Sequence, residues 1–215
     1  MSLWMKIAGH SLAGLLLFGN LAKAEPAVSF SDTTNAAPSL VWTKLQSELE
    51  RERQVISKCR TDIEGCTSPA ARRFIAIVEE GARYDGKARI AHINRAANFA
   101  IRSTTMPVLG WTSPLAALAA GAGDCKQFAM LKYAALMESG FGPEQLRILI
   151  VEDKPRRATH AVVAVRAGAQ WLVLNNRTST LVEFDDFLNQ QALLWTLDRA
   201  ASAEFSPQRD GKPGL

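Results

Sequence analysis

One cysteine of this sequence stands where its side chain could act as a nucleophile. Cys125 follows Gly-Ala-Gly-Asp and precedes a run with helical periodicity, so Asp124 is a good N-cap and the cysteine falls in the first helical turn. The helix dipole and the free N–H groups there favour a thiolate. Lys126 would add positive potential if it turned toward the sulfur, and Gly123 clears space for a substrate backbone. The alternative is a small cysteine that simply packs inside a core helix.

A histidine lies at the mouth of a predicted strand further along the chain. His160 opens the apolar run His-Ala-Val-Val-Ala-Val after a polar loop, a position from which its ring can project into a cleft and act as a base. The alternative is a histidine that caps the strand or is satisfied in the core. His92 lies in the middle of a predicted helix between two arginines, and we interpret it as structural.

An asparagine at the end of the next strand is the third candidate. If residues 160–166 and 171–175 pair as a hairpin about Gly168-Ala169, Asn175 lies near position 162, where its amide can reach the His160 ring. A nucleophile, a base and an orienting group are the three parts that acyl transfer needs. Asparagine at a strand end is equally a common turn residue.

Helices followed by strands are predicted to position these side chains. The apolar spacing predicts helices over residues 40–58, 69–80, 86–102, 115–120 and 125–139. Short apolar or alternating runs predict strands over residues 146–152, 160–166, 171–175, 180–183 and 193–197. A run of helices followed by a run of strands indicates an α+β fold with an antiparallel sheet.

The N-terminal segment predicts export. Residues 1–24 combine a lysine, an apolar stretch and Ala-Lys-Ala, which is typical of a cleaved signal peptide; the alternative is an uncleaved anchor. Residues 25–38 are predicted to be a flexible lead-in, residues 39–200 one domain, and residues 201–215 a disordered tail. No later segment is apolar and long enough to cross a bilayer, so the mature chain has no predicted transmembrane segment.

The cysteine count agrees with an oxidising compartment. Cys59 and Cys66 lie close together around a stretch that can turn back on itself, and we expect them to form a disulfide between two helices. Cys125 is then left unpaired, and a free thiol in such a compartment is either buried or functional. No spacing of histidines, cysteines or carboxylates indicates a metal site.

Charge excludes one class of partner. The formal net charge of +4 falls to +2 once the signal segment, with Lys6 and Lys23, is removed. No basic face with interleaved aromatic residues is evident, so a nucleic-acid partner is not expected.

Several blocks of the chain resemble a known family. "GAGDCKQFAMLKYAAL", "THAVVAV" and "WLVLNNRT", with "INRAANFAI" and "WTSP" upstream, are similar to the bacterial transglutaminase-like cysteine proteinases, the LapG-type periplasmic proteases. The similarity extends from about Trp42 to Asp198. It implies a papain-like or transglutaminase-like core, with Cys125 as nucleophile, His160 as base and Asn175 at the third triad position.

Two positions depart from the pattern that the resemblance implies. The family usually has aspartate where this chain has Asn175, although papain-like proteases work with asparagine. The family commonly has Gly-Asp-Cys-Glu, and its LapG-type members bind calcium through the acidic residues beside the cysteine. Here Asp124 matches but Lys126 replaces the glutamate, and a cation at that position opposes calcium binding. We therefore expect no cofactor.

The sequence thus predicts an exported, periplasmic cysteine endopeptidase that acts through a Cys-His-Asn triad, in which the Cys125 backbone N–H contributes to the oxyanion hole and Trp111 lines the cleft. For LapG-type members the resemblance implies a large surface adhesin as substrate, a role in biofilms, and a regulatory inner-membrane receptor as partner. Two alternatives remain open. One is a transamidase that uses the same acyl-enzyme, and the other is a non-catalytic periplasmic binding module.

Overall fold

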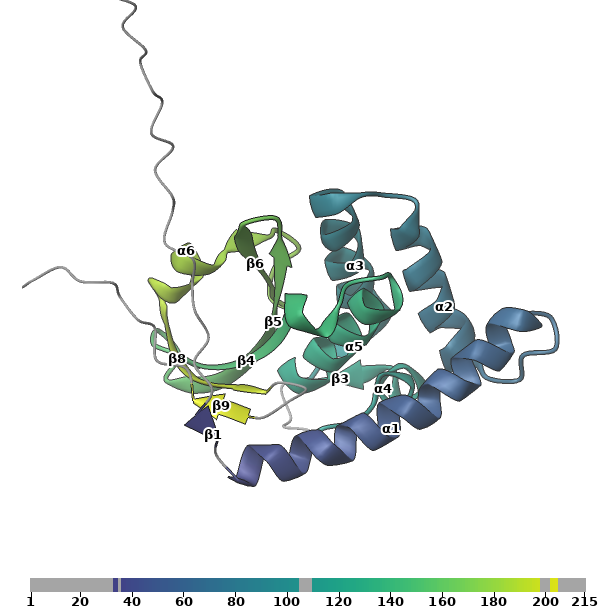
Figure 1. The fold of residues 1–215 in the computed structure, drawn as a ribbon, viewed down its shortest axis with the longest axis horizontal. Helices are drawn as coiled ribbons and strands as arrows, with labels where there is room; N and C mark the ends of the chain where they lie inside the picture. The colour runs from purple at the N-terminus through teal and green to yellow at the C-terminus, as the bar shows by residue number, and fades with distance from the viewer. Residues whose placement is uncertain (1–32, 35, 105–109, 198–201, 205–215) are drawn as a thin grey trace, which may run out of the picture.

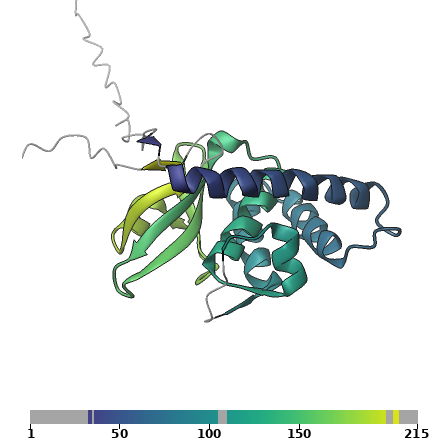
Figure 2. The ribbon, with the colours of Figure 1, turned by 90° about the horizontal axis from the view of Figure 1, so that it is seen from below.

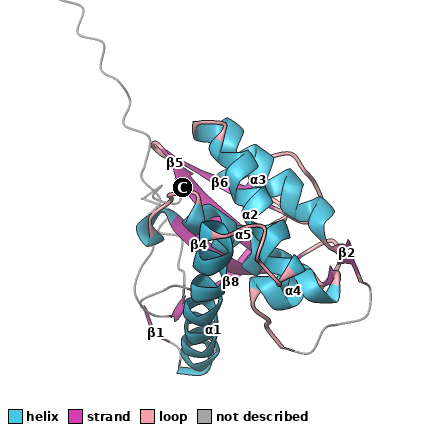
Figure 3. Ribbon diagram, turned by 90° about the vertical axis from the view of Figure 1, so that its right-hand side faces the viewer, coloured by secondary structure: helices cyan, strands magenta, loops and turns pink. Residues whose placement is uncertain are grey.

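The computed structural model describes residues 33–34, 36–104, 110–197 and 202–204, and the predicted signal peptide lies outside them. Helices and a sheet form two layers (Figures 1 and 3). The predicted α+β class is confirmed. The helices are α1 (Ala36–Thr61), α2 (Pro69–Ala82), α3 (Gly86–Ala100), α4 (Pro114–Ala120), α5 (Cys125–Glu138) and α6 (Phe184–Leu188), with a 3₁₀ turn at Pro143–Gln145.

The strands follow the helices, as the order of patterns predicted. They are β1 (Thr33–Thr34), β2 (Arg102–Ser103), β3 (Ala122–Gly123), β4 (Leu146–Asp153), β5 (Ala158–Ala167), β6 (Gln170–Leu174), β7 (Val182–Glu183), β8 (Gln191–Leu197) and β9 (Ser202–Glu204). All but β2 and β3 join one antiparallel sheet in the order β1-β9-β8-β4-β5-β6-β7. Residues 33–34 and 202–204, which the sequence assigned to the lead-in and the tail, therefore pair at one edge of this sheet.

The hairpin that carries two candidate residues has the predicted register. β5 and β6 turn at Gly168, which has a positive φ of 66° that glycine adopts without strain. Val163 pairs with Leu174, so Asn175 follows at the position opposite Val162. Residues two apart on a strand share a face, and the Asn175 side chain therefore projects on the same side as His160.

Two apolar clusters hold the sheet, one on each of its faces. The larger cluster fills the space between α1–α5 and the sheet face that carries Ile148, Ile150, Ala161, Val163 and Val165. The smaller cluster covers the opposite face, where Phe184 and Phe187 of α6 pack on Leu149, Val151, Val162, Ala164, Trp171 and Val173. Both faces are buried, which explains why β4 and β5 are continuous apolar runs rather than alternating ones.

Helix α5 lies at the centre of the helical layer. It packs against α3 and against β5. α1 runs along the bottom of Figure 1 and crosses in front of the other helices in Figure 2, which is seen from below. Residues Gln127 to Leu136 of α5 are all buried, so the helix is enclosed around its whole circumference. A helix in this position fixes the orientation of its first turn, where Cys125 lies.

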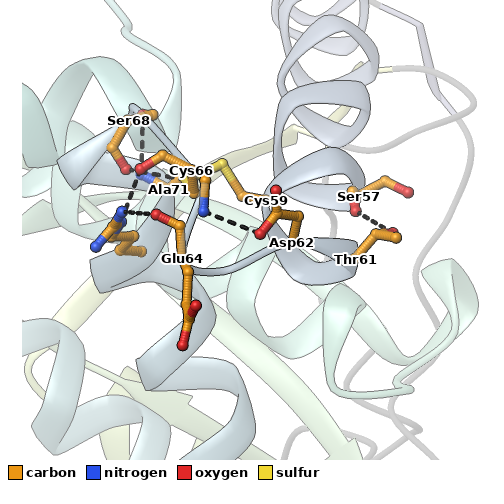
Figure 4. Close-up of a disulfide and its surroundings, with 10 residues drawn as sticks. Ser57, Cys59, Thr61, Asp62, Glu64, Cys66, Ser68 and Ala71 are labelled. Atoms are coloured by element: carbon orange, nitrogen blue, oxygen red, sulfur yellow. Dashed lines mark hydrogen bonds between the residues drawn. A yellow bond between two sulfur atoms is a disulfide. The ribbon is translucent and has the colours of Figure 1, made fainter.

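The predicted disulfide joins the end of α1 to the start of α2. Cys59 and Cys66 are bonded, with their Cα atoms 4.7 Å apart (Figure 4). The loop between them is held by the Asp62 carboxylate, which accepts the Gly65 N–H at 2.9 Å. Ser68 then caps α2 by accepting the Ala71 N–H at 3.2 Å. Among the described residues, no helix has the length and apolar character needed to cross a membrane.

Candidate active site

The loop that precedes Cys125 is held from two sides. β2 pairs with β3 in parallel, and the Thr104 N–H donates to the Gly123 carbonyl at 3.0 Å. On the other side a capping box closes the start of α5: the Asp124 carboxylate accepts the Lys126 N–H at 3.0 Å, and Gln127 Oε1 accepts the Asp124 N–H at 3.1 Å. Cys125 is therefore the first residue of α5, as its sequence context predicted.

Gly123 has a structural role in addition to the one predicted. The residue is buried, and a Cβ placed on it would lie 2.5 Å from the Cβ of Gln127 and 3.3 Å from Cδ1 of Ile101. The absent side chain makes room for the Gln127 side chain, which completes the capping box. That Gly123 also clears a path for substrate stays a prediction.

Lys126 does supply a positive charge, but its partner is Asp124. Its ammonium lies 2.6 Å from Asp124 Oδ2, and both side chains are largely buried. That this lysine also turns toward the sulfur stays a prediction. The ion pair neutralises the one carboxylate that stands next to Cys125 in the chain.

Cys125 is the one free thiol of the protein. The sequence has three cysteines, two of which form the disulfide. The Cys125 side chain is partly buried and packs against the larger apolar cluster. A thiol in this position is shielded on its helix side and retains exposed surface, which is the environment that reactive cysteines occupy.

His160 and Asn175 are in direct contact. His160 is the third residue of β5 and is 2% exposed, and its Nε2 lies 3.0 Å from Asn175 Oδ1. The predicted approach of these two side chains is confirmed. Cys125 and His160 are not hydrogen-bonded to each other, although α5 packs against β5. Catalytic hydrogen bonds are often long before substrate binds.

The Arg177 backbone N–H determines which ring nitrogen of His160 carries the proton in its contact with Asn175. The Arg177 N–H donates to Asn175 Oδ1 at 3.1 Å, and a backbone N–H can only donate. The atom of Asn175 that faces it must therefore be the carbonyl oxygen, which fixes the orientation of the amide. Because that same oxygen faces His160, Nε2 of the ring must carry the proton. Nδ1 is then the basic nitrogen of the neutral ring.

A buried ion cluster lies behind the same loop. Asp153, at the end of β4, is fully buried and accepts from the Arg156 guanidinium at 3.1 Å and from the Arg177 guanidinium. Burial acts to raise the pKa of Asp153, but the hydrogen bonds from Arg177 and Arg156 outweigh it and hold the pKa below its ordinary value. Arg177 thus connects the buried carboxylate of Asp153 to the amide of Asn175.

The surroundings of His160 favour the neutral ring. Burial lowers the pKa of His160 to about 4, and the hydrogen bond with Asn175 opposes this only in part. The positive charges of Arg177 and Lys132 act in the same direction as burial, whereas Asp153 opposes it. At neutral pH the imidazole is therefore uncharged and able to accept a proton.

Lys132 is an unexpected component of this region. It lies on α5, two turns after Cys125, and is 1% exposed. Within the part of the chain that the structure describes, its ammonium has no hydrogen-bond partner, and it lies over the Phe128 ring at 6.0 Å from the centroid. Burial lowers the pKa of Lys132 from 10.5 to about 7.

Trp111 lies between α1 and the start of α4. It lines a groove together with Lys44, Glu48, Arg51 and Glu52 of α1. Its neighbour Gly110 accepts a hydrogen bond from the Gln127 side chain at 3.3 Å, which ties this segment to the first turn of α5. The prediction that Trp111 lines a substrate cleft stays a prediction.

Several residues around the site had no assigned role in the sequence. Asp153 and Lys132 gave no usable signal, because a strand-end aspartate and a helical lysine are ordinarily solvent-exposed. Asn94 and Asn98 were visible as polar residues on the apolar stripe of the helix at residues 86–102. Because buried amides are normally hydrogen-bonded, two asparagines four residues apart on an apolar helix face were the one pattern from which a hydrogen-bonded contact could have been predicted.

The structure thus has a helix that begins with a free cysteine and packs on an antiparallel sheet carrying a histidine–asparagine pair. The family model described as bacterial transglutaminase-like cysteine proteinase (BTLCP) matches residues 54–192, and the chain belongs to this family. The matched range includes Cys125, His160 and Asn175. No curated protein matches the sequence.

Solved structures of one protein share the fold. LapG from Legionella pneumophila superposes with a TM-score of 0.58 at 19% identity, covering 71% of this chain and 86% of LapG. Its calcium-bound form gives a TM-score of 0.59 at 19% identity, covering 78% and 92%. At this identity the similarity establishes the fold alone.

The residues beside Cys125 do not fit a calcium ion. Calcium binds oxygen ligands, several of them carboxylates. Here Asp124 is the one acidic residue of the motif, and both of its oxygens are bound by Lys126, one by the backbone N–H and one by the ammonium. Across residues 36–104 and 110–197, no group of three or more histidine, cysteine, aspartate or glutamate side chains could hold a metal.

Proposed function

We propose that this protein is a periplasmic cysteine endopeptidase in which Cys125, His160 and Asn175 form the catalytic triad. The observation that carries the proposal is the His160–Asn175 hydrogen bond, whose polarity the Arg177 N–H fixes. This contact leaves Nδ1 of a neutral ring as the base in a member of a cysteine proteinase family. The periplasmic location is proposed from residues 1–24, and a protein substrate follows from the family.

The chemistry begins with transfer of the Cys125 thiol proton to Nδ1 of His160. The thiolate then attacks the peptide carbonyl carbon, and the Cys125 backbone N–H stabilises the oxyanion at the start of α5. The His160 imidazolium gives its proton to the leaving amine as the C–N bond breaks, which leaves a thioester. Water, deprotonated by His160, attacks the thioester and releases the carboxylic acid and the free thiol.

Asn175 holds the ring throughout these steps. Its Oδ1 accepts the Nε2–H, so the imidazole stays in the tautomer that presents Nδ1. Because asparagine carries no charge, it orients the imidazolium without stabilising it electrostatically as an aspartate would. The Cys125 thiolate must therefore supply most of the electrostatic stabilisation of the His160 imidazolium.

Alkylation of Cys125 by iodoacetamide tests the catalytic pair. Since the other two cysteines are bonded to each other, the reagent reports on Cys125 alone. Its second-order rate constant, measured from pH 4 to pH 9, should exceed that of a free peptide thiol at neutral pH and fall to that level in His160→Ala. The wild-type protein, but not Cys125→Ser, should cleave fluorescently labelled casein.

Two results would count against the proposal. Alkylation no faster than that of a peptide thiol, and unaffected by His160→Ala, would favour a non-catalytic binding module. Incorporation of a primary amine into casein without cleavage would identify a transamidase that uses the same thioester.

A further inference from the structure

Helix α3 reaches across to the loop that carries Asn175. Residues 175–181 connect β6 to β7, and residues 175–179 of this connection belong to neither strand. Asn98 Nδ2 donates to the carbonyl oxygens of Asn175 and Thr178, both at 3.1 Å. One turn earlier, Asn94 Nδ2 donates to the carbonyl oxygens of Thr178 and Ser179, at 3.3 Å and 3.2 Å. Two amides thus hold three backbone carbonyls of this loop.

The polarity of these contacts is unambiguous. The groups that face the two amides are backbone carbonyls, which only accept, so each amide must present its nitrogen. The Oδ1 atoms of Asn94 and Asn98 are buried and have no partner among the described residues. An unpaired buried acceptor costs free energy, so these asparagines are not the side chains that stability alone would favour at the two positions.

We propose that Asn94 and Asn98 are positioning residues that hold the 175–179 loop so that Asn175 Oδ1 stays on His160 Nε2. This inference rests on the proposed function, because it assigns the two amides to the orienting arm of the triad. Asn98 fixes the backbone of Asn175 itself, and this position of the backbone places the Asn175 side chain against the His160 ring. The Arg177 N–H, two residues on in the same loop, holds the amide orientation.

The pair is fixed to a rigid element. α3 packs on both α2 and α5, and Asn94 is fully buried. These four hydrogen bonds therefore attach the loop to the helical layer that contains Cys125, whereas His160 belongs to the sheet. A movement of the helices relative to the sheet would change the contact between Asn175 and the His160 ring.

The sharpest variant is Asn98→Asp, which keeps the shape of the side chain but replaces its two donors with an acceptor facing carbonyl oxygens. Asn98→Ala removes the same donors without adding charge and serves if the aspartate variant does not fold. Asn189→Asp adds the same charge at an exposed position on the end of α6. Ser68→Ala removes the α2 cap and lowers stability without changing a contact of the loop.

The direct readout is the ¹⁵N chemical shift of the two His160 ring nitrogens. In wild type, Nε2 should be protonated and Nδ1 unprotonated. In both Asn98 variants we expect the two shifts to move toward each other as the second tautomer becomes populated, and kcat to fall about tenfold with KM within twofold. Neither control should change the ring shifts.

The inference would be overturned if the ring ¹⁵N shifts of folded Asn98→Asp and Asn98→Ala stayed at their wild-type values. It would also be overturned if Ser68→Ala changed these shifts as much as the Asn98 variants do. The spectroscopic readout does not need turnover. If the wild type cleaves nothing and the ring shifts still respond, the positioning role stands and the proposed function fails.

Discussion

Replacing Lys132 with methionine should stabilise the fold by an amount that falls as the pH rises. The ammonium of Lys132 is buried on α5 without a hydrogen-bond partner among the described residues, which makes its charge costly. Methionine has nearly the same length and fills the same apolar space. Buried charges replaced by well-packed apolar side chains commonly stabilise a protein by about 1–4 kcal/mol.

The magnitude follows from the titration of Lys132. Its pKa is about 7 in the folded protein against 10.5 ordinarily, because burial disfavours the charged form. The unfolded chain therefore binds more protons between these two values, and the stability of the wild type rises with pH across that window. Linkage gives a penalty of about 4 kcal/mol at pH 7 and about 2 kcal/mol at pH 9. Lys132→Met carries no such penalty at either pH.

Urea unfolding at pH 7 and pH 9 measures the difference directly. The gap in unfolding free energy between Lys132→Met and wild type should shrink by about 2 kcal/mol from the lower to the higher pH. Lys58→Met, at an exposed position in the last turn of α1, is the matched control and should show no such change. A gap that stays constant between the two pH values would mean that Lys132 keeps an ordinary pKa, and the account of its burial would be wrong.

Three further predictions concern the site and its supports. Asn175→Asp should raise the pKa of His160 above its present value of about 4, since a carboxylate beside the ring favours the imidazolium; NMR titration of the ring measures it, and an unchanged pKa would contradict the 3.0 Å contact. The double variant Cys59→Ala/Cys66→Ala should lose about 2.5 kcal/mol of stability in urea, because the bond closes a short loop, and equal stability would refute this. A calcium chelator should change the melting temperature of the wild type by no more than about 1 °C, whereas it should lower the melting temperature of calcium-loaded Lys126→Glu by more than that. A large decrease in the wild type would show that the ion pair with Asp124 does not exclude the metal.

Local patterns were sufficient to predict the elements and one contact of the site. The spacing of apolar residues placed the five larger helices within a few residues of their observed ends, and the Gly168 turn set the register that brings Asn175 to His160. Both are determined by neighbours along the chain. α6 was not predicted because its five residues are too few for a helical period to be distinguished from a strand.

Long-range polar contacts were beyond what one sequence reveals. Asp153, Arg177 and the two asparagines of α3 meet only after the sheet has formed and α3 has packed on α5. The packing role of Gly123 has the same origin. The sequence does not show which side chain lies beside a glycine, and here a Cβ would meet Gln127.

The two departures from the family pattern can be understood together through charge. An aspartate at position 175 would stabilise the imidazolium. With asparagine there, burial lowers the pKa of His160 to about 4, and the nearby Asp153 is already paired with two arginines. A thiolate at Cys125 would then be the main partner of the imidazolium, so a bare carboxylate beside the sulfur would oppose the charged pair. Lys126 removes that opposition by binding Asp124 at 2.6 Å.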